Sequence, residues 1–358
     1  MLAGRHAVRV LAEPNDELSE GPSAAARMLY SVSRKRAVEQ VVDEFQPDVV
    51  HLHNVYPSIG PAVHLAAKPR GIPIVMTLHN FRLRCPNGLM FTEGSLCQRC
   101  QHGVYLHAAM HRCFPTERQA VAYASILWIH RFVMQLEATV STFIAPSEFM
   151  KRRVLSWGID ERRVRLVEHF VRRSAGSPTR ARVGFYGMFV GRLAAGKGLD
   201  VLLRALGKAG DPPFVIVGDG PSSADLQALA RSIGLRHTRF TGWQQHEDVN
   251  DLLAEARYVV VPSLVEEAAP LSALEALAAG CPLLVSDRGA LPEFVGGGRG
   301  LVSRAGDVGD LAARLVQLLD DDALCRRASE KALSFARRSL DPERHLADLE
   351  SVYGALSA

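Results

Sequence analysis

The feature that most constrains this chain is an alternation of short β-branched runs with helical patterns, which occurs twice along its length. This alternation is typical of βαβ units, in which helices cover a parallel sheet. In the first half the predicted strands are VRVLA (8–12), DVVHLH (48–53), IPIVMTLH (72–79) and TFIAPS (142–147), and helices are expected near 23–45, 59–67, 116–137 and 147–156. The first half therefore predicts one open α/β domain.

The alternation lapses near Arg172 into RRSAGSPTRARVG, where clustered Gly, Ser and Pro indicate a linker. It then restarts, with predicted strands at 184–190, 214–218, 256–263 and 281–286, and with helices starting at Lys197, Pro221, His246 and Leu271. Further helical patterns run over 308–319, 323–337 and 342–356. A length of 358 residues also exceeds what one hydrophobic core usually covers.

The sequence thus predicts two Rossmann-like domains, one over 1–173 and one over 181–340, and a last helix in 341–358 that could return to the first domain. In open parallel sheets, ligands bind beyond the carboxyl ends of the strands. Two such domains facing each other would put the functional site in a cleft between them.

Composition favours a globular cytoplasmic protein, with 47% hydrophobic and 22% charged residues. The most apolar stretch, Ala120 to Ile129, is much shorter than the ~20 residues that a membrane span needs. Near the N-terminus, Arg5 and Arg9 stand where a signal peptide would have its apolar core. We therefore expect reduced cysteines, as in the cytoplasm.

The excess of basic residues over acidic ones lies in the first half. The runs Arg34–Arg36, Lys151–Arg153 and Arg162–Arg163 could attract an anionic membrane surface or a phosphate-bearing acceptor. Ordinary solvated helix faces are the alternative. Nucleic acid is not expected as a partner, because aromatic residues are not interleaved with these runs.

The most informative stretch is PSLVEEAAPLSALEALAAGCPLLVSDRGALPE (262–293), which holds two glutamates, Glu267 and Glu275. Glu267 follows a predicted strand and could accept hydrogen bonds from sugar hydroxyls. The free N–H groups at the start of the helix near Leu271 suit an anion such as a diphosphate. Glu275, about one turn further on, could reach ribose hydroxyls. Taken alone, the two glutamates could equally be surface carboxylates on a helix.

Upstream, FVGRLAAGKGLDVLLRAL (189–206) reads as a strand, a glycine-containing turn and a helix. Arg192 and Lys197 lie on that turn, where both cations could point at donor phosphates and take the place of a metal. Ordinary loop charge is the alternative for this pair. The glycines of GDGP (218–221) fit a structural strand-to-helix turn.

Taken in order, VGRL…KG, VGDGP, FTGW, VPS with the two glutamates, EALAAGCP and DRGALPE resemble the C-terminal half of the glycosyl transferase group 1 family, the retaining GT-B enzymes called family 4. The first half resembles the N-terminal domain of the same family through HLHNVYP (51–57), TLHNFRLRCPNG (77–88) and APSEFMKRR (145–153). The resemblance spans nearly the whole chain.

The resemblance implies roles for individual residues. Arg192 and Lys197 would bind the donor diphosphate, Glu275 the ribose, and Glu267 the hydroxyls of the transferred sugar. The amides of Leu271 and Ser272 would lie near the phosphate, and Gly242 and Trp243 near the base. His79 would lie beside the donor sugar, with a satisfied interior histidine as the alternative. The catalytic set implied by the resemblance is His79, Glu267, Arg192 and Lys197.

Two departures from the family pattern stand out. The family begins with a strand and a Gly-rich loop, whereas here MLAGRH resembles the tail of the first helix and VRVLA the second strand. Either the start codon is misassigned or the enzyme is shortened at its N-terminus. Glu168-His169 also stands where relatives tend to have Pro-Asn.

Four of the six cysteines, Cys85, Cys97, Cys100 and Cys113, lie in an insertion over 81–113. A Cys97-x-x-Cys100 knuckle with one flanking cysteine on each side could form a structural zinc site. His102, His107 or His111 could replace one ligand, and reduced, unligated thiols are the alternative. No cofactor is expected to be needed for catalysis.

The expected activity is therefore retaining transfer of a sugar from a nucleotide diphosphate donor to a glycan, lipid-linked or small-molecule acceptor. The alternative from another class is a catalytically impaired nucleotide-sugar-binding protein that partners a polysaccharide-assembly complex. Peripheral association with the inner face of a membrane is a further expectation.

Overall fold

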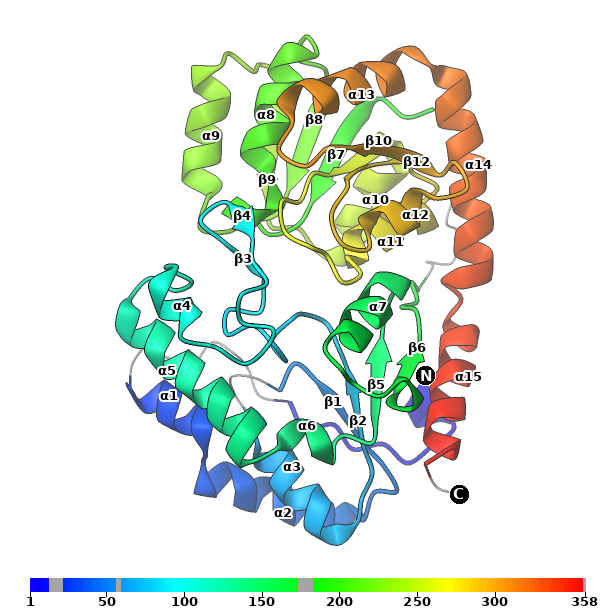
Figure 1. Ribbon diagram of the computed structural model, residues 1–358. Coiled ribbons are helices and arrows are strands. Elements are labelled where there is room, and N and C mark those ends of the chain that lie inside the picture. The colour runs from blue at the N-terminus through cyan, green and yellow to red at the C-terminus, as the bar shows by residue number, and fades with distance from the viewer. Residues whose placement is uncertain (13–21, 56–58, 173–182, 357–358) are drawn as a thin grey trace. The chain divides into compact units, whose positions relative to one another are not determined.

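The computed structural model describes residues 1–12, 22–55, 59–172 and 183–356. The chain divides into two compact units (Figure 1): unit 1 is Met1–Glu168 with His345–Ala358, and unit 2 is His169–Arg344. The predicted boundary residues 173, 181 and 358, and most of the predicted linker, lie outside the described residues.

Unit 1 contains a parallel sheet. Its described strands have the order β1-β2-β5-β6, and they are β1 (Val50–His53), β2 (Ile74–Thr77), β5 (Thr142–Ala145) and β6 (Val164–Leu166). Its helices are α1 (Pro22–Leu29), α2 (Val32–Phe45), α3 (Ala62–Ala67), α4 (His107–Met110), α5 (Glu117–Trp128), α6 (Leu136–Thr139) and α7 (Glu148–Ser156). A small antiparallel hairpin, β3 (Phe91–Thr92) with β4 (Ser95–Leu96), lies in the insertion.

The helices of unit 1 end where the sequence supplies local signals. The predicted helix 23–45 is two helices, because Ser31 is extended and its side chain accepts a hydrogen bond from the Arg34 amide, which starts α2. The predicted helix 116–137 is also interrupted: α5 passes into a π-helical turn, η3 (Ile129–Val133), before the left-handed Gln135 that precedes α6.

The predicted strand at 8–12 is wrong. These residues adopt no regular structure, and the side chains of Val8, Val10 and Leu11 are exposed. A strand needs a neighbour to complete its hydrogen bonds, and none of the described strands pairs with this segment. The strand β6 was not predicted, because its three residues are too few to show a pattern and take their conformation from pairing with β5.

The last helix, α15 (Pro342–Gly354), contributes to the core of unit 1 from His345 onward. Leu349 and Val352 pack with Val75, Ile144 and Val167 of the sheet. The end of the sequence thereby completes a domain built mainly from its beginning.

Unit 2 is a doubly wound α/β domain. Its described strands run parallel in the order β12-β11-β10-β7-β8-β9, and they are β7 (Tyr186–Val190), β8 (Phe214–Val217), β9 (Thr238–Gly242), β10 (Ala256–Val261), β11 (Leu283–Ser286) and β12 (Gly300–Ser303). Its helices are α8 (Leu199–Lys208), α9 (Ser223–Ser232), α10 (His246–Glu255), α11 (Leu271–Ala278), α12 (Leu291–Val295), α13 (Val308–Asp320) and α14 (Asp322–Ser339).

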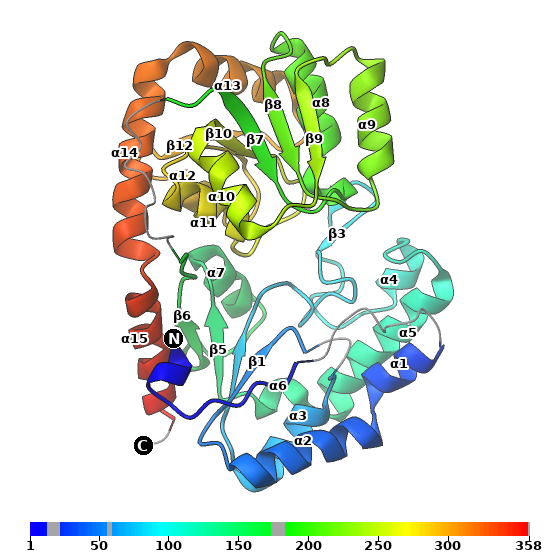
Figure 2. The same ribbon diagram turned by 180° about the vertical axis from the view of Figure 1, so that it is seen from behind.

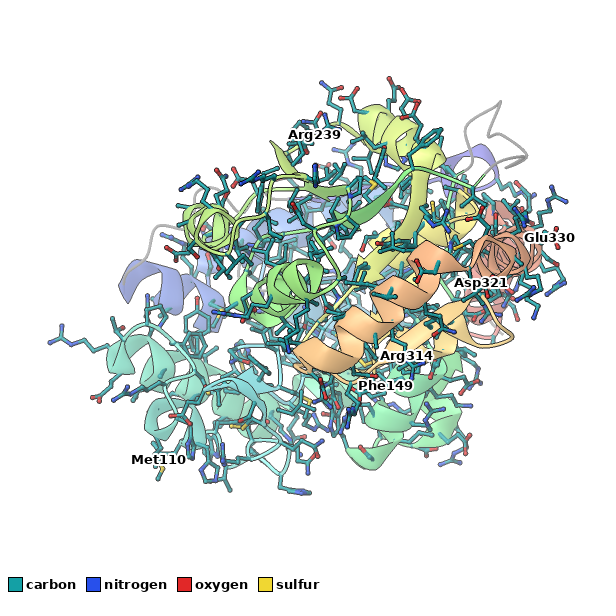
Figure 3. All side chains as sticks on the ribbon, turned by 90° about the horizontal axis from the view of Figure 1, so that it is seen from above. Met110, Phe149, Arg239, Arg314, Asp321 and Glu330 are labelled. Atoms are coloured by element: carbon teal, nitrogen blue, oxygen red, sulfur yellow. The ribbon has the colours of Figure 1, made fainter. Side chains whose placement is uncertain are left out.

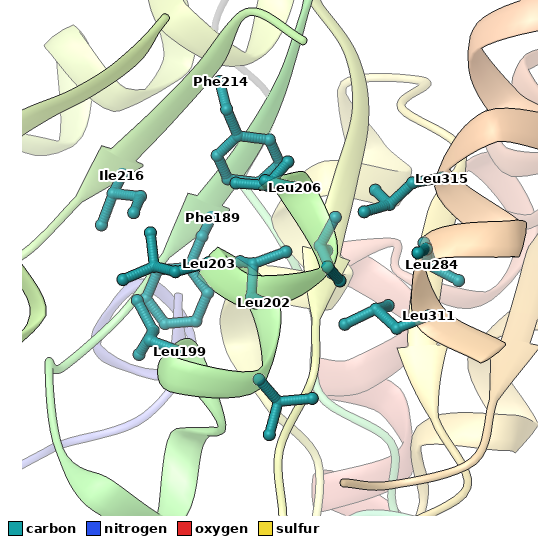
Figure 4. Close-up of a cluster of buried hydrophobic side chains, with 14 of the residues drawn as sticks. Phe189, Leu199, Leu202, Leu203, Leu206, Phe214, Ile216, Leu284, Leu311 and Leu315 are labelled. Atoms are coloured by element: carbon teal, nitrogen blue, oxygen red, sulfur yellow. The ribbon is translucent and has the colours of Figure 1, made fainter. Parts of the chain in front are cut away.

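The strand order of unit 2 reverses between β7 and β10. Chain crossovers run one way from β7 to β9 and the other way from β10 to β12, so α8 and α9 cover one face and α10, α11 and α12 the other (Figure 2). On the first face the leucines of α8 and α13 form a continuous core with Phe189 and Phe214 (Figure 4). The reversal is the topological switch point at which open α/β sheets bind ligands.

None of the described helices combines the length and apolar character that crossing a bilayer requires.

Candidate functional site

The loops that follow β7 and β8 in unit 2 touch backbone to backbone. The amide of Leu193 donates to the Asp219 oxygen at 2.9 Å, and the Ser222 amide donates to the Leu193 oxygen at 3.0 Å. A Cβ at Gly218 would lie 1.9 Å from the Gly191 oxygen, and one at Gly220 2.4 Å from the Leu193 oxygen. The glycines of GDGP are therefore required by close packing, as expected for a structural turn.

A second set of contacts joins the β7 loop to the loop after β10. The Gly196 oxygen accepts the amide of Leu264 at 2.9 Å. Gly198 has φ +69°, and a Cβ there would lie 2.1 Å from the Pro262 oxygen. Only glycine fits this left-handed position against another backbone. The turn that carries Lys197 is thus fixed against the loop that carries Glu267.

The structure brings Lys197 and Glu267 into contact. Lys197 Nζ lies 2.7 Å from Glu267 Oε1, and the Ser263 hydroxyl donates to the same oxygen at 2.6 Å. Ser263 is fully buried, and its own carbonyl oxygen accepts a hydrogen bond from Ser286 Oγ at 2.6 Å. Glu267 Oε2 makes no hydrogen bond to any residue within the described ranges. One carboxylate oxygen is therefore held in place and the other is available.

The backbone of Glu267 is fixed from a third loop. Its carbonyl oxygen accepts the Ala290 amide at 2.8 Å, and a Cβ at Gly289 would lie 2.4 Å from both its nitrogen and its oxygen. The DRGALPE segment therefore supports the glutamate by direct backbone packing. Loops after β7, β10 and β11 converge on this one residue.

The amino end of α11 lies directly beyond this loop. Pro270 precedes the helix without a side-chain cap, and the amides of Leu271 and Ser272 donate to no group among the described residues. Free amides and the helix dipole together favour an anion at such an end.

Glu275 lies on the same helix, where burial raises the pKa of its carboxyl and the nearby His246 lowers it. Glu275 Oε1 is 3.8 Å from His246 Nδ1. The Glu275 side chain is thus partly buried, and it lies within ion-pairing distance of the exposed His246 and not of Lys197.

The other predicted residues of unit 2 lie at the same edge of the sheet without contacting the pair. Arg192 follows β7, is exposed, and forms no ion pair with a residue of the described segments. Gly242 ends β9 with φ +71°, and its oxygen accepts the Gly218 amide at 2.8 Å. Trp243 follows it and is 72% exposed.

His79 lies in unit 1 at the carboxyl end of β2. Its Nε2 is 2.9 Å from His53 Nδ1, at the end of the neighbouring strand β1. His51, on β1, is held between the Tyr353 hydroxyl at 2.6 Å and the Thr77 hydroxyl at 2.7 Å. Burial and the nearby His53, His79 and His345 lower the pKa of His51 to about 3, so its ring is neutral.

A cavity of about 80 Å³ adjoins His79 in unit 1. Its polar lining includes Asn54 and Asn80, and the Asn80 amide donates to Asn54 Oδ1 at 2.9 Å. Asn54 has φ +46°, a strained backbone for a non-glycine residue. Tyr56 and Pro57, which complete the HLHNVYP motif, lie outside the described residues.

The four cysteines of the insertion line one small cavity, together with Asn87 and Met90. Cys85 Sγ donates to Asn87 Oδ1 at 2.9 Å, and burial with the neighbouring thiols raises the pKa of Cys100 to about 12. Across the described ranges, no three His, Cys, Asp or Glu side chains are arranged to hold a metal ion. The zinc site stays a prediction.

Sequence reasoning missed Ser263, His51 and His53. Ser263 was visible in the VPS segment but was assigned no role. The two histidines lie in the HLHNVYP motif, and their contacts with Tyr353 and His79 depend on segments far apart in the sequence.

Two family models match the chain, "Glycosyltransferase Family 4" over residues 1–174 and "Glycosyl transferases group 1" over residues 184–335. Among curated proteins, it is 32% identical to the alpha-D-kanosaminyltransferase of Streptomyces kanamyceticus over 151 residues. That alignment covers 40% of this chain and 39% of the enzyme, so the chain spans about two fifths of this relative.

Among solved structures, a glycosyltransferase of Rickettsia africae gives a TM-score of 0.68 at 14% identity, covering 99% of this chain and 86% of that one. Anabaena HepE in complex with UDP and glucose gives 0.65 at 18% identity, covering 92% and 83%. At these identities the likeness establishes the fold alone. The two family models and this fold together identify the chain as a member of the group 1, family 4 glycosyltransferases, with the GT-B fold.

Proposed function

We propose that this protein is a retaining glycosyltransferase that transfers a hexosyl group from a nucleotide diphosphate donor to a glycan, lipid-linked or small-molecule acceptor. The observation that carries the proposal is the Lys197–Glu267 pair at the switch point between β7 and β10. Open α/β sheets bind nucleotides at this point. HepE, which has the same fold, was crystallised with UDP and glucose, which supports a nucleotide-sugar donor here.

Lys197 and Arg192 are the proposed ligands of the donor diphosphate, aided by the amides of Leu271 and Ser272. In the free protein the charge of Lys197 is balanced by Glu267. A diphosphate would offer the ammonium a stronger anionic partner. Because cations and helix amides neutralise the phosphates, we propose that no metal cofactor is needed for catalysis.

Glu267 is the proposed receptor for the hydroxyls of the transferred sugar. Ser263 holds Oε1, which leaves Oε2 to accept hydrogen bonds from those hydroxyls. A carboxylate fixed on one side and open on the other orients a sugar more tightly than a freely rotating one.

Further donor contacts are proposed for Glu275 with the ribose and for Gly242 and Trp243 with the base. His79 is proposed to act toward the donor sugar, on the strength of its place in the TLHN motif. These assignments rest on the family resemblance and on positions at the carboxyl ends of strands.

In the proposed reaction, the acceptor hydroxyl attacks the anomeric carbon on the face from which the diphosphate leaves. The bond from that carbon to the phosphate oxygen breaks, and the hydroxyl proton passes to the leaving phosphate. Negative charge grows on the diphosphate during this step. Lys197, Arg192 and the amino end of α11 would stabilise that charge without having to reorganise.

A thermal stabilisation screen across UDP-, GDP-, ADP- and dTDP-sugars tests the proposal. A donor at about 100 times its dissociation constant should stabilise the fold by about 2.7 kcal/mol. Glu267→Gln should reduce the shift for the matching sugar and leave the shift for the free nucleotide nearly intact. If no nucleotide sugar in the panel shifts the melting temperature, the proposal is wrong.

The catalytically impaired alternative gains no support from any observation above. Release of nucleotide diphosphate in the presence of a matched donor distinguishes an active transferase from a protein that only binds the donor. Turnover that Lys197→Ala reduces supports the transferase, and tight donor binding without any turnover supports the alternative.

A further inference from the structure

Exposed apolar side chains gather in one part of unit 1. They occupy the loop before α4, α4 itself, α5 and the turn η3, and they are Val104, Leu106, Met110, Val121, Trp128, Phe132 and Val133. Figure 1 shows α4 and α5 lying side by side, and in Figure 3 Met110, the last residue of α4, lies at the outer edge of the view. Exposed apolar side chains that gather on neighbouring elements are typical of an interaction site.

Four of these residues form what we call the aromatic patch: Val104, Trp128, Phe132 and Val133. Each is between 45% and 62% exposed. The rings of Trp128 and Phe132, one helical turn apart, have centroids separated by 5.8 Å. Phe132 also lies against the neighbouring loop, since a Cβ at Gly103 would be 2.6 Å from Phe132 Cζ. The patch therefore joins the end of α5 to the loop that carries Val104.

The patch is not needed for the core beneath it. The preceding turns of α5 supply Ala120 and Ala124, which are buried, and Ala124 packs with Cys100, Tyr105 and Ala108. Arg131 fixes the loop from inside, donating to the Gln101 oxygen at 3.3 Å and to the Tyr105 hydroxyl at 3.0 Å. The two aromatic rings thus stand outside a structure that is already packed.

The segment of the chain that carries the patch is basic. Residues 97–135 contain Arg99, Arg112, Arg118 and Arg131 against a single acidic residue, Glu117. The first three are exposed, and none forms an ion pair with a residue in the described ranges. The Arg131 guanidinium lies 5.0 Å over the Phe132 ring.

The basic runs noted in the sequence differ from this surface. Lys35 pairs with Glu39 at 2.5 Å, Lys151 with Glu161 at 3.5 Å, and Arg162 with Asp160 at 2.5 Å. Each run has an acidic neighbour that offsets part of its charge. At the α4–α5 surface, by contrast, exposed aromatic side chains occur in a segment whose exposed arginines form no ion pair with a described residue.

We propose that the aromatic patch and its arginines bind the surface of an anionic lipid bilayer. Trp and Phe rings partition into the headgroup region, with Trp keeping its N–H toward water. Each arginine near an anionic surface contributes about 1 kcal/mol. A symmetric dimer through this patch would bring the same arginines against one another, so an anionic partner fits better than a second copy.

Flotation of the full chain with unilamellar vesicles tests the proposal. Vesicles of phosphatidylcholine alone are compared with vesicles containing about one third phosphatidylglycerol, at low and at high salt. The wild type should float with the anionic vesicles and be released by salt. Two variants should each bind the anionic vesicles at least about tenfold more weakly than the wild type. They are the double variant Trp128→Ser/Phe132→Ser and the triple variant Arg99→Glu/Arg112→Glu/Arg118→Glu.

Phe185→Ser is the matched control, because Phe185 is 67% exposed but lies in unit 2. This variant should bind vesicles as the wild type does. All variants should keep the wild-type stabilisation by donor, which separates this proposal from the proposed function and shows that they fold.

The proposal is wrong if the wild type does not bind anionic vesicles at low salt, or if the double and triple variants bind as tightly as Phe185→Ser. It is equally wrong if light scattering finds a dimer that the double variant abolishes while vesicle binding is unchanged. The patch would then be a contact between copies of this chain.

Discussion

The ion pair between Lys197 and Glu267 joins two side chains that are 70 residues apart in the sequence. Both are partly shielded from solvent, with 33% of the lysine and 13% of the glutamate side chain exposed. A pair this open contributes little to stability by itself. The ion pair matters for the site because it holds a cation and a carboxylate side by side at the edge of the sheet where such folds bind nucleotides.

Lys197→Ala should lower turnover by roughly 10²-fold or more, because it removes one donor to the charge that develops on the leaving diphosphate. The control is Lys208→Ala, which removes an exposed lysine at the far end of α8. Initial rates with the matched donor, at saturating acceptor, measure both. Near wild-type turnover in Lys197→Ala would remove the proposed role.

At the scale of elements, glycines decide how closely the loops of unit 2 approach. Gly198 lets α8 begin against the Pro262 oxygen, and Gly289 lets the DRGALPE loop pack on Glu267. Each of these two close approaches is possible only because the glycine carries no Cβ. The glycines of the sequence motifs are required by these contacts, but the sequence alone does not show which backbone atoms they approach.

The insertion of unit 1 is the element whose chemistry is still a prediction. Its four cysteines share one cavity, but their placement does not form a metal site among the described residues. If zinc binds, the thiols must lose their protons and move together, since thiolates are the ligands. Elemental analysis of purified protein should then give close to one zinc per chain.

The control for that measurement is Cys281→Ser, because Cys281 is buried in unit 2. It should leave the zinc content unchanged, whereas Cys100→Ser should abolish it. Less than ~0.2 zinc per chain in the wild type would count against the site, given the tight binding typical of such clusters.

At the scale of the whole molecule, unit 1 carries several histidines whose pKa is lowered. Four histidines of the described part of unit 1, His51, His53, His64 and His130, have a lowered pKa, chiefly because of burial. His64 is 2% exposed, and burial with the nearby His130 lowers its pKa to about 4. Its Nδ1–H donates to Thr139 Oγ1 at 2.6 Å, because that hydroxyl already donates to the Leu136 oxygen.

Unit 1 should therefore lose stability first as the pH falls. Below about pH 6.5 the unfolded chain protonates these histidines while the folded unit does not, so folding is disfavoured until the pH reaches the folded pKa values. A histidine as buried as His64 then costs about 1.4 kcal/mol per pH unit in that window. Calorimetry at pH 7.5 and 5.5 should show a transition assigned to unit 1 moving to lower temperature.

His64→Gln supplies the comparison for the acid effect. It keeps a side chain that can donate to Thr139 but does not titrate, so its loss of stability between the two pH values should be smaller than that of the wild type. Equal losses in both proteins would contradict the assignment to His64. A donor nucleotide should protect unit 2 without changing the acid sensitivity of unit 1.

Much of the architecture could be read from residue patterns. Strands such as FVIVG and CPLLVS are short apolar runs between turn signals, so local periodicity identified them, and the group 1 motifs identified the family. Local patterns failed where the outcome depends on a neighbour. Residues 8–12 alternate like a strand but pair with none of the described strands. The strands β6, β9 and β12 were missed because their few residues gain their conformation from adjacent strands.

The sequence by itself determined the class of fold, the family and the residue types at the donor edge, because these depend on periodicity and on motifs that are contiguous in the chain. Only the tertiary structure decided that Lys197 meets Glu267, that Ser263 holds one oxygen of that carboxylate, and that His53 meets His79. It also decided that Trp128 and Phe132 stand outside the core. These facts depend on how separate segments pack, and pairing across long distances leaves no local signal in the chain.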